Sequence, residues 1–330
     1  MKKNETEFII DCRNKVLAGG SIDKNDALEL LNVSAGAHEM LLLAANAIRE
    51  NFNGNSVEVC SIVNGRSGRC TENCAFCAQA SIHHSGVDEY ESMDYQFILE
   101  HAQNAEKNGA TRFSIVTSGR GIENGKWFDN LLDCYSRLKK ETDLRLCASH
   151  GLITRQQAVE LAAAGVTRYH HNLETGRNYF SNICTTHSYE QRIETIRNAQ
   201  FAGMAVCSGG IIGMGESLQD RIDMAFELKA LNVESVPVNI LIPIAGTRLE
   251  GRALLSRSEV LRTYAVFRMI LPDRQIRYAA GRATMEKDRV TGYQAGVNAT
   301  IAGTLLTTAG QDYAEEKSII MQAGRVVLSE

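Results

Sequence analysis

The order of hydrophobic and polar positions alternates between two patterns along the chain. Short runs rich in Val, Ile and Leu are separated by longer segments in which apolar residues recur every three or four positions. The first pattern predicts strands and the second predicts helices. The predicted strands are Val57–Val63, Arg112–Thr117, Leu144–Ala148, Arg168–Leu173, Ala205–Ile212, Ser235–Ile242, Gln275–Ala279 and Ala299–Gly303.

Eight predicted strands that alternate with helices indicate an α/β protein built as a (β/α)8 barrel, the TIM-barrel fold. An open doubly wound sheet is the alternative, because it uses the same alternation. Residues 1–52 have a helical pattern and precede the first strand, so we expect an N-terminal helical cap. The barrel is expected over residues 53–320, and a C-terminal tail over residues 321–330.

Local signals mark where several of the predicted helices begin and end. Thr154–Gln157 and Ser188–Gln191 are capping boxes, in which two side chains bond free backbone N–H groups of the first turn. Ser217 and Ser258 are predicted to begin two further helices, and Pro272 follows the end of the last one. These helices all fall between predicted strands, as a barrel requires.

Composition and charge narrow the classes of function. The 330 residues are 44% hydrophobic and 22% charged, with a net charge of −4 and no block of basic residues. We therefore expect neither nucleic acid nor a membrane as a partner. The N-terminus is too polar for a secretion signal, so a cytoplasmic protein is expected. Its nine cysteines are then expected to be reduced core residues, metal ligands or nucleophiles.

Three cysteines lie within eight residues, just after the first predicted strand. Cys70, Cys74 and Cys77 follow the spacing C-x3-C-x2-C. Three thiolates this close can hold a cubane iron–sulfur cluster that usually takes four, which leaves one iron open to a further ligand. A zinc site is the alternative, but structural zinc usually takes four protein ligands and no second cysteine pair lies nearby. The spacing favours a 4Fe–4S cluster.

This motif, with an aromatic residue before its last cysteine, resembles that of the radical S-adenosylmethionine superfamily. The resemblance implies that the amino and carboxylate groups of S-adenosylmethionine bind the open iron. The reduced cluster would then cleave the cofactor to a 5′-deoxyadenosyl radical, while the protein positions the reactants and excludes water. It also implies that the backbone near Phe76 contacts the adenine.

Further segments resemble the biotin synthase family within that superfamily. They are Tyr169–Thr175, Asn182–Thr186, Tyr189–Arg192, Cys207–Glu216, Val236–Asn239 and Ala280–Arg282. The family resemblance implies a sulfurtransferase that inserts sulfur into dethiobiotin to form biotin, with two hydrogen abstractions. The sulfur would come from an auxiliary iron–sulfur cluster deep in the barrel. A flavodoxin- or ferredoxin-type electron donor and a homodimer are also implied.

The resemblance assigns binding roles to particular residues. Asn172, Glu174 and Arg192 match positions that contact S-adenosylmethionine, although the family usually has Asp at position 174. Gly210 belongs to the segment expected to border the same cofactor. Asn172 and Asn239 match positions that hydrogen-bond the ureido ring of the substrate. A buried amide needs both donors and acceptors, and a ureido group offers both.

The auxiliary cluster is where this sequence departs from the family. The familiar form holds a 2Fe–2S cluster with three cysteines and an arginine, and Cys147, Cys207 and Arg282 match three of these positions. The third cysteine position falls at Ser114, whose hydroxyl is a poor iron ligand at neutral pH. Cys60 stands on the first predicted strand where the family commonly has serine.

We therefore hypothesise that Cys60, Cys147 and Cys207 hold an auxiliary cluster of altered geometry. Three thiolates suit a 4Fe cluster whose fourth iron carries an extra, exchangeable sulfide, which would be the donated atom. Arg282 is either a ligand or a nearby cation. The cysteines of both clusters are thus expected to be catalytic. For Cys60 alone, the simpler interpretation is a small buried apolar residue.

The remaining candidates have weaker signals. Cys184 follows the fourth predicted strand and is an alternative ligand, while Cys12 and Cys134 lie in helical segments and are interpreted as structural. His170 and His171 end a strand, so one is expected to face the barrel interior and the other to pack outward.

Two other functions remain open. A hydrogenase-cofactor maturase or a methylornithine synthase would share the barrel and the first cluster, but would not be expected to combine Cys147 and Cys207 with Arg282. A non-catalytic iron–sulfur carrier would need no nucleoside site such as the Gly209–Glu216 segment.

Overall fold

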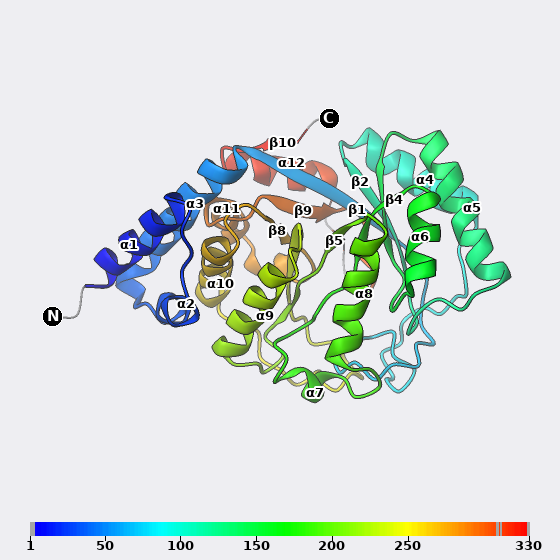
Figure 1. Cartoon of the computed structure of the whole chain (residues 1–330), viewed down its shortest axis with the longest axis horizontal. Helices are drawn as coiled ribbons and strands as arrows, with labels where there is room; N and C mark the ends of the chain where they lie inside the picture. The colour runs from blue at the N-terminus through cyan, green and yellow to red at the C-terminus, as the bar shows by residue number, and fades with distance from the viewer. Residues whose placement is uncertain (1–3, 308–309, 311, 329–330) are drawn as a thin grey trace.

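The computed structural model describes residues 4–307, 310 and 312–328, and these form a closed parallel barrel surrounded by helices (Figure 1). The order of the paired strands is β10-β1-β2-β3-β4-β5-β7-β8-β9, and β9 pairs again with β1 to close the barrel. The strands are β1 (Ser56–Arg66), β2 (Arg112–Thr117), β3 (Arg145–Ser149), β4 (Val166–His170), β5 (Ala205–Cys207), β6 (Gly210–Ile212), β7 (Ser235–Ile240), β8 (Gln275–Tyr278), β9 (Ala299–Ala302) and β10 (Val326–Val327). The barrel prediction is confirmed, and the open sheet is excluded.

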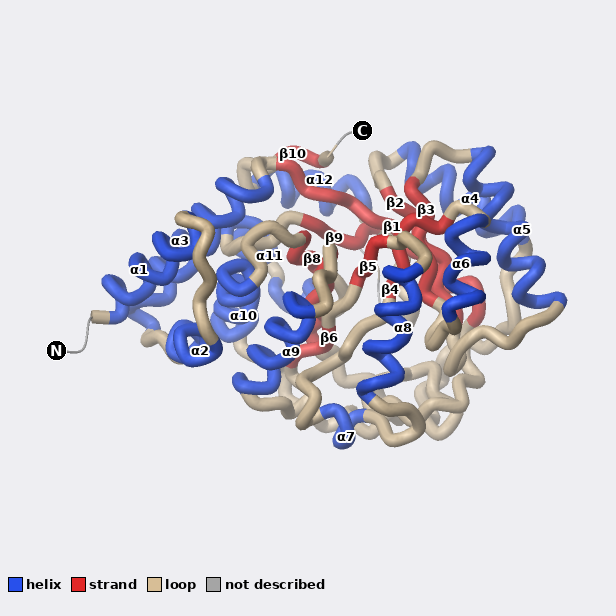
Figure 2. The backbone as a smooth tube through the Cα atoms, in the orientation of Figure 1, coloured by secondary structure: helices blue, strands red, loops and turns tan. Residues whose placement is uncertain are grey.

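Helices cover the outside of the barrel, as Figure 2 shows. They are α4 (Tyr95–Lys107), α5 (Lys126–Glu141), α6 (Arg155–Ala163), α7 (Phe180–Ile183), α8 (Tyr189–Phe201), α9 (Leu218–Ala230), α10 (Arg257–Ile270), α11 (Asp288–Gln294) and α12 (Tyr313–Gln322), with short 3-10 turns at Ala35–Ala37 and Arg282–Met285. No helix in the described ranges is long and apolar enough to cross a membrane.

The capping signals correctly located three helix starts, while one was misplaced by two residues. Thr154, Ser188 and Ser217 each cap a helix through a reciprocal capping box. The helix that was predicted to begin at Ser258 is instead capped by Ser256, whose hydroxyl accepts the Glu259 N–H at 3.3 Å. Two serines two positions apart give the same composition signal, and only the backbone conformation selects between them.

The predicted fifth strand, Ala205–Ile212, is broken in two. β5 ends at Cys207, and β6 pairs with β7 alone. A Cβ atom at Gly209 would lie 1.9 Å from the carbonyl oxygen of Pro237, so only glycine permits this approach. The break admits the loop after β4, because the Glu174 N–H donates to Gly209 O at 3.0 Å and the Ile211 N–H donates to Glu174 O at 2.8 Å.

The N-terminal helices pack against the side of the barrel. Helices α1 (Glu5–Leu17), α2 (Lys24–Leu31) and α3 (His38–Asn53) form a group beside α10, at the blue end of the chain in Figure 1. At the other end, residue 320 falls inside α12, and β10 adds in parallel to the start of β1. Residues 329–330 of the expected tail lie outside the described part of the chain.

Candidate active site in the barrel interior

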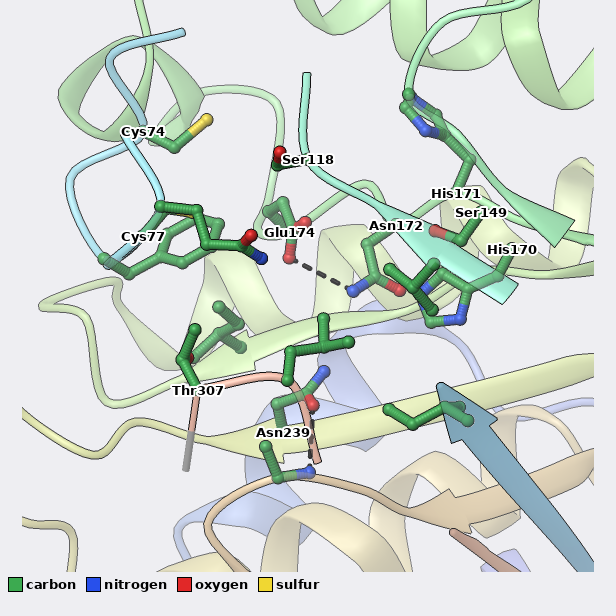
Figure 3. Close-up of a pocket in the computed structure, with 18 of the residues that line it drawn as sticks. Cys74, Cys77, Ser118, Ser149, His170, His171, Asn172, Glu174, Asn239 and Thr307 are labelled. Atoms are coloured by element: carbon green, nitrogen blue, oxygen red, sulfur yellow. Dashed lines mark hydrogen bonds between the residues drawn. The ribbon is translucent and has the colours of Figure 1, made fainter. Parts of the chain in front are cut away.

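A cavity of about 380 Å³ opens inside the barrel towards the carboxyl ends of the strands (Figure 3). Most residues singled out from the sequence line it. They are Cys60, Cys70, Cys74, Phe76, Cys77, Cys147, Asn172, Glu174, Arg192, Cys207 and Asn239. Gly210 and Arg282 are not among the lining residues. The fold therefore brings side chains from seven separate segments to one space.

Strand register sorts these side chains by depth along the barrel axis. Cys147 lies beside Ser114 on one neighbouring strand and beside Arg168 on the other. Cys207 lies beside His170. The C-x3-C-x2-C loop follows β1, and the asparagines stand at or beyond strand ends, so both lie nearer the carboxyl ends than these cysteines do. The cavity thus has a cysteine layer near its base and a second cysteine group at its mouth.

The loop at the mouth is held in a fixed conformation by its own backbone. The Cys70 N–H donates to Gln79 O at 3.0 Å, and the Ser81 N–H returns a bond to Cys70 O at 2.8 Å. The Ala75 N–H donates to Ile183 O at 2.9 Å, which ties the loop to α7. Burial raises the pKa of the Cys77 thiol to about 11, so a thiolate there needs a compensating positive charge such as iron.

Cys184 lies directly beside this loop. Its Sγ is 3.3 Å from Nδ1 of His187, and His187 also contacts the carboxylate of Glu72. The sulfur and nitrogen atoms of Cys74, Cys184 and His187 lie within 4.8 Å of one another, and all three residues are buried. Hydrogen bonds lower the pKa of Cys184 to about 2. The bond from Cys74 has the largest effect, and those from His187 and Thr186 add to it, against the effect of burial. Cys184 was a candidate from sequence, whereas His187 was missed.

In the deeper layer, two of the three cysteines contact each other. A hydrogen bond from Cys60 lowers the pKa of Cys147 to about 6, helped by the positive charges of Arg112 and Arg168, and the pKa of Cys60 is raised in turn. These thiols face the same cavity as Cys207.

The surroundings of Cys207 also favour its thiolate. Burial opposes its thiolate, but His170 and the arginines lower its pKa to about 7. A set of buried thiols in a cationic setting suits iron–sulfur ligation.

Arg277 of β8 faces this layer, as Arg168 does, whereas Arg282 does not. Arg282 donates to the Glu316 carboxylate at 3.3 Å and to Ala279 O at 3.2 Å, away from the cavity. Arg277 lines the cavity beside Cys60 and Cys207. The alternation of β8 contained this signal: Tyr278 packs outward on Tyr264, so its neighbour must point inward.

Ser114 faces the cavity, and its buried hydroxyl has no hydrogen-bond partner. His170 and His171 both border the cavity, so the expectation that one would pack outward is wrong. His170 is the last residue of β4 and lies beside Cys207, while His171 begins the loop after β4, where strand alternation no longer decides which way a side chain points.

The polar groups at the mouth form a connected network (Figure 3). The Asn172 amide donates to Glu174 at 3.3 Å and accepts the Gly209 N–H at 3.1 Å. Arg192 of α8 donates to the Asn172 carbonyl at 2.7 Å and lies 3.7 Å from the Glu174 carboxylate. Burial raises the pKa of Glu174, although the Arg192 charge opposes this. Asn239 is fixed by donating to Gly210 O and accepting the Ala280 N–H, each at 3.1 Å.

Comparisons with known proteins agree over most of the chain. The Radical SAM superfamily matches residues 66–228, and the Biotin and Thiamin Synthesis associated domain matches residues 237–326. The biotin synthase of Clostridium perfringens strain 13 is 46% identical over 96% of this chain and 98% of its own length. That of Carboxydothermus hydrogenoformans is 48% identical over the same shares.

Solved structures share the fold at low identity. A methylornithine synthase superposes with a TM-score of 0.81 at 19% identity, covering 96% of this chain and 97% of its own. The FeFe-hydrogenase maturase HydG from Carboxydothermus hydrogenoformans gives 0.80 at 17%, covering 98% and 79%. At these identities the likeness concerns the barrel alone.

Proposed function

The chain belongs to the biotin synthase family, and from that premise we propose how its own residues perform sulfur insertion. It is a radical S-adenosylmethionine sulfurtransferase that forms biotin from dethiobiotin and uses a 4Fe–4S cluster. The observation that carries this conclusion is the 46–48% identity to biotin synthases over 96% of the chain. A non-catalytic carrier would not need the nucleoside-binding residues of this site.

We propose that Cys70, Cys74 and Cys77 hold the 4Fe–4S cluster at the barrel mouth. When bound, this cluster supplies the electron that cleaves S-adenosylmethionine. Glu174 offers a carboxylate to the ribose hydroxyls, and Arg192 offers a guanidinium to the methionine carboxylate. Their existing contacts with Asn172 support this assignment, because the groups are already oriented before a ligand binds. Phe76 borders the same space, and the Gly210 segment reaches it through the neighbouring residue Ile211.

Dethiobiotin would bind between the two cysteine groups. Asn239 lines the cavity there, and its amide is held at both ends by backbone bonds. Asn172 stands on the opposite side of the gap in Figure 3. Apolar residues of the lining, including Ile240 and Ile301, suit the aliphatic part of the substrate and exclude water from the reacting carbon atoms.

For the auxiliary cluster, we propose Cys60, Cys147 and Cys207 as ligands. When bound, this cluster supplies the sulfur atom. The contact between Cys60 and Cys147 and the cationic surroundings of Cys207 support the set. Ser114 stands where the familiar form has cysteine. A 4Fe cluster with an additional sulfide remains our hypothesis for its composition, and Arg277 replaces Arg282 as the neighbouring cation.

The deciding assay is anaerobic incubation with dethiobiotin, dithionite and S-adenosylmethionine. We expect biotin and 5′-deoxyadenosine to form together. Absence of biotin from protein with both clusters intact would overturn the substrate assignment, and absence of 5′-deoxyadenosine would indicate a carrier.

The ligand set has a separate test in Cys60→Ala. Losing one thiolate should remove the auxiliary irons in a Mössbauer count and abolish biotin formation, while reductive cleavage of S-adenosylmethionine continues. Cys134→Ala, a buried cysteine in α5, is the matched control and should keep both activities. Two auxiliary irons that persist unchanged in Cys60→Ala would contradict the proposal.

Further proposals follow from the family. We propose a flavodoxin- or ferredoxin-type electron donor, a homodimer and a cytoplasmic location. Light scattering of the purified chain tests the dimer, and electron transfer from each reduced donor to the 4Fe–4S cluster identifies the partner.

A further inference from the structure

A buried ion cluster lies against the cysteine layer, and the proposed function does not use it. The Glu58 carboxylate of β1 accepts from Arg112 Nε at 2.8 Å and from Arg168 Nη1 at 3.0 Å. It also accepts from Nη2 of Arg277. Exposure of the four residues lies between 2% and 7%. These residues, Glu58, Arg112, Arg168 and Arg277, are called the cationic floor below.

The charges of the cationic floor do not balance. The Glu58 carboxylate accepts hydrogen bonds from three guanidinium groups, and this arrangement favours its ionised form. One carboxylate therefore meets three guanidinium groups, a surplus of two positive charges that the thiolates of Cys147 and Cys207 and the cluster they would hold can balance. The other carboxylates that line the cavity, Glu72 and Glu174, belong to its mouth. Buried charge without a partner is strongly destabilising, so the surplus implies that something anionic binds beside it.

A second feature points the same way. Arg168 uses Nη1 for Glu58, but its buried Nε has no hydrogen-bond partner. Arg268, another fully buried arginine, differs because it donates to four backbone carbonyls and to Asn298. Arg145 and Arg192 also keep a buried Nε without a partner. What distinguishes Arg168 is that its free donor lies beside the cysteine layer, where a bound anion has a donor available to it.

The cationic floor lies against all three proposed auxiliary ligands. Glu58 and Cys60 are two residues apart on β1, so their side chains share the inner face. Cys147 is the strand neighbour of Arg168 and lies within hydrogen-bonding reach of Arg112. Arg277 faces both Cys60 and Cys207.

Each nitrogen of Arg277 already donates a hydrogen bond to the protein. Its Nε donates to Ser235 Oγ at 3.2 Å, Nη1 donates to Thr300 O at 2.6 Å, and Nη2 donates to Glu58. A protonated guanidinium offers no lone pair to iron, and these bonds, one of them to a carboxylate, favour the protonated form.

We propose that the cationic floor stabilises the anionic auxiliary cluster through charge alone, with Glu58 as the positioning residue that fixes the three arginines and none of them as an iron ligand. This inference rests on the auxiliary cluster of the proposed function. A thiolate-bound iron–sulfur cluster with bound sulfide is anionic, and each reduction adds negative charge, so a nearby cation favours the reduced form.

The proposal is tested by removing a positive or a negative charge from the cationic floor, because the two changes should shift the redox equilibrium of the auxiliary cluster in opposite directions. In Arg168→Gln holoenzyme, the ratio of reduced to oxidised auxiliary cluster at a fixed potential should fall by roughly tenfold, as expected for one charge in a medium with a dielectric constant of about 20. Arg168→Lys should restore the ratio, and Glu58→Gln should raise it. The 4Fe–4S cluster at the mouth is the internal control and should not change in an EPR-monitored redox titration.

Two outcomes with these variants would overturn the proposal. One is an unchanged ratio of reduced to oxidised auxiliary cluster. The other is a shift of this ratio in the same direction for Arg168→Gln and Glu58→Gln, as a purely structural role would give. A further measurement needs no variant. Wild-type protein labelled with guanidino-¹⁵N arginine should show no directly bonded ¹⁵N in electron–nuclear double resonance of the reduced auxiliary cluster, and a bonded signal overturns the charge-only role.

Failure of this inference is distinguishable from failure of the proposed function. Biotin formation with unchanged ratios overturns the cationic floor alone. Wild-type protein that lacks any auxiliary cluster after anaerobic reconstitution overturns both.

Discussion

At the scale of single residues, a few side chains both hold the backbone of the site in place and orient the groups proposed to bind the ligand. Asn172 binds Gly209 N–H through its oxygen and Glu174 through its nitrogen, so one amide fixes both the broken strand and the acid. Glu174 itself has a φ of 73°, a conformation that non-glycine residues rarely adopt. Strain of this kind is typical of functional positions, and it aims the carboxylate at the cavity.

Replacing Glu174 by Gln should weaken S-adenosylmethionine binding by about tenfold, because a charge-assisted bond to the ribose becomes a neutral one. Anaerobic calorimetric titration of the protein with its 4Fe–4S cluster measures the dissociation constant. Glu190→Gln, at an exposed position on α8, is the control and should bind normally. Equal affinity in the wild type and Glu174→Gln would contradict the assigned role.

At the scale of elements, helix starts and strand ends determine which side chains reach the cavity. The capping box at Ser188 begins α8 so that Arg192, one turn later, points at the loop after β4. The break between β5 and β6 likewise seats that loop against Gly210. Capping was predictable, because its signal is a local pair of residue types. The break was not, because it depends on how closely Pro237 of β7 approaches Gly209.

The cap of α10 can be tested with two neighbouring serines. Ser256→Ala should lower the free energy of unfolding by about 1 kcal/mol, since the Glu259 N–H loses its partner. This corresponds to a fall of roughly 1–2 °C in Tm for a chain of this size. Ser258→Ala, which removes no cap, should change the free energy by less than about 0.5 kcal/mol. A larger effect from Ser258→Ala would favour the position predicted from sequence.

At the scale of the whole molecule, the side chains of the site occupy successive depths along the axis of the barrel. The cationic floor and the cysteine layer lie side by side near the base, amide groups lie beyond them, and the cysteine loop lies at the mouth. Most cysteines of both groups are buried, and a buried thiolate is stable only beside positive charge, which bound iron would add to that of the arginines. Metal binding is then coupled to folding, because the clusters bind the native arrangement and not the unfolded chain.

Removing both clusters by anaerobic chelation after oxidation should therefore lower Tm by at least about 4 °C. Differential scanning calorimetry of holoprotein and stripped protein measures the change. Reconstitution with iron and sulfide should return Tm to its original value, which distinguishes cluster loss from oxidative damage. Equal Tm values before and after stripping would show that neither cluster contributes to stability.

The sequence by itself determined the barrel, the C-x3-C-x2-C loop and most of the cavity lining, because hydrophobic period and residue spacing are local properties of the chain. Only the tertiary structure decided three features of the site: Arg277 points inward, His187 lies beside Cys184, and three arginines surround Glu58. Each depends on the register between strands that are distant in sequence, or on which face a side chain takes. A closed barrel converts such register into contact, since every inward residue meets those of all the other strands.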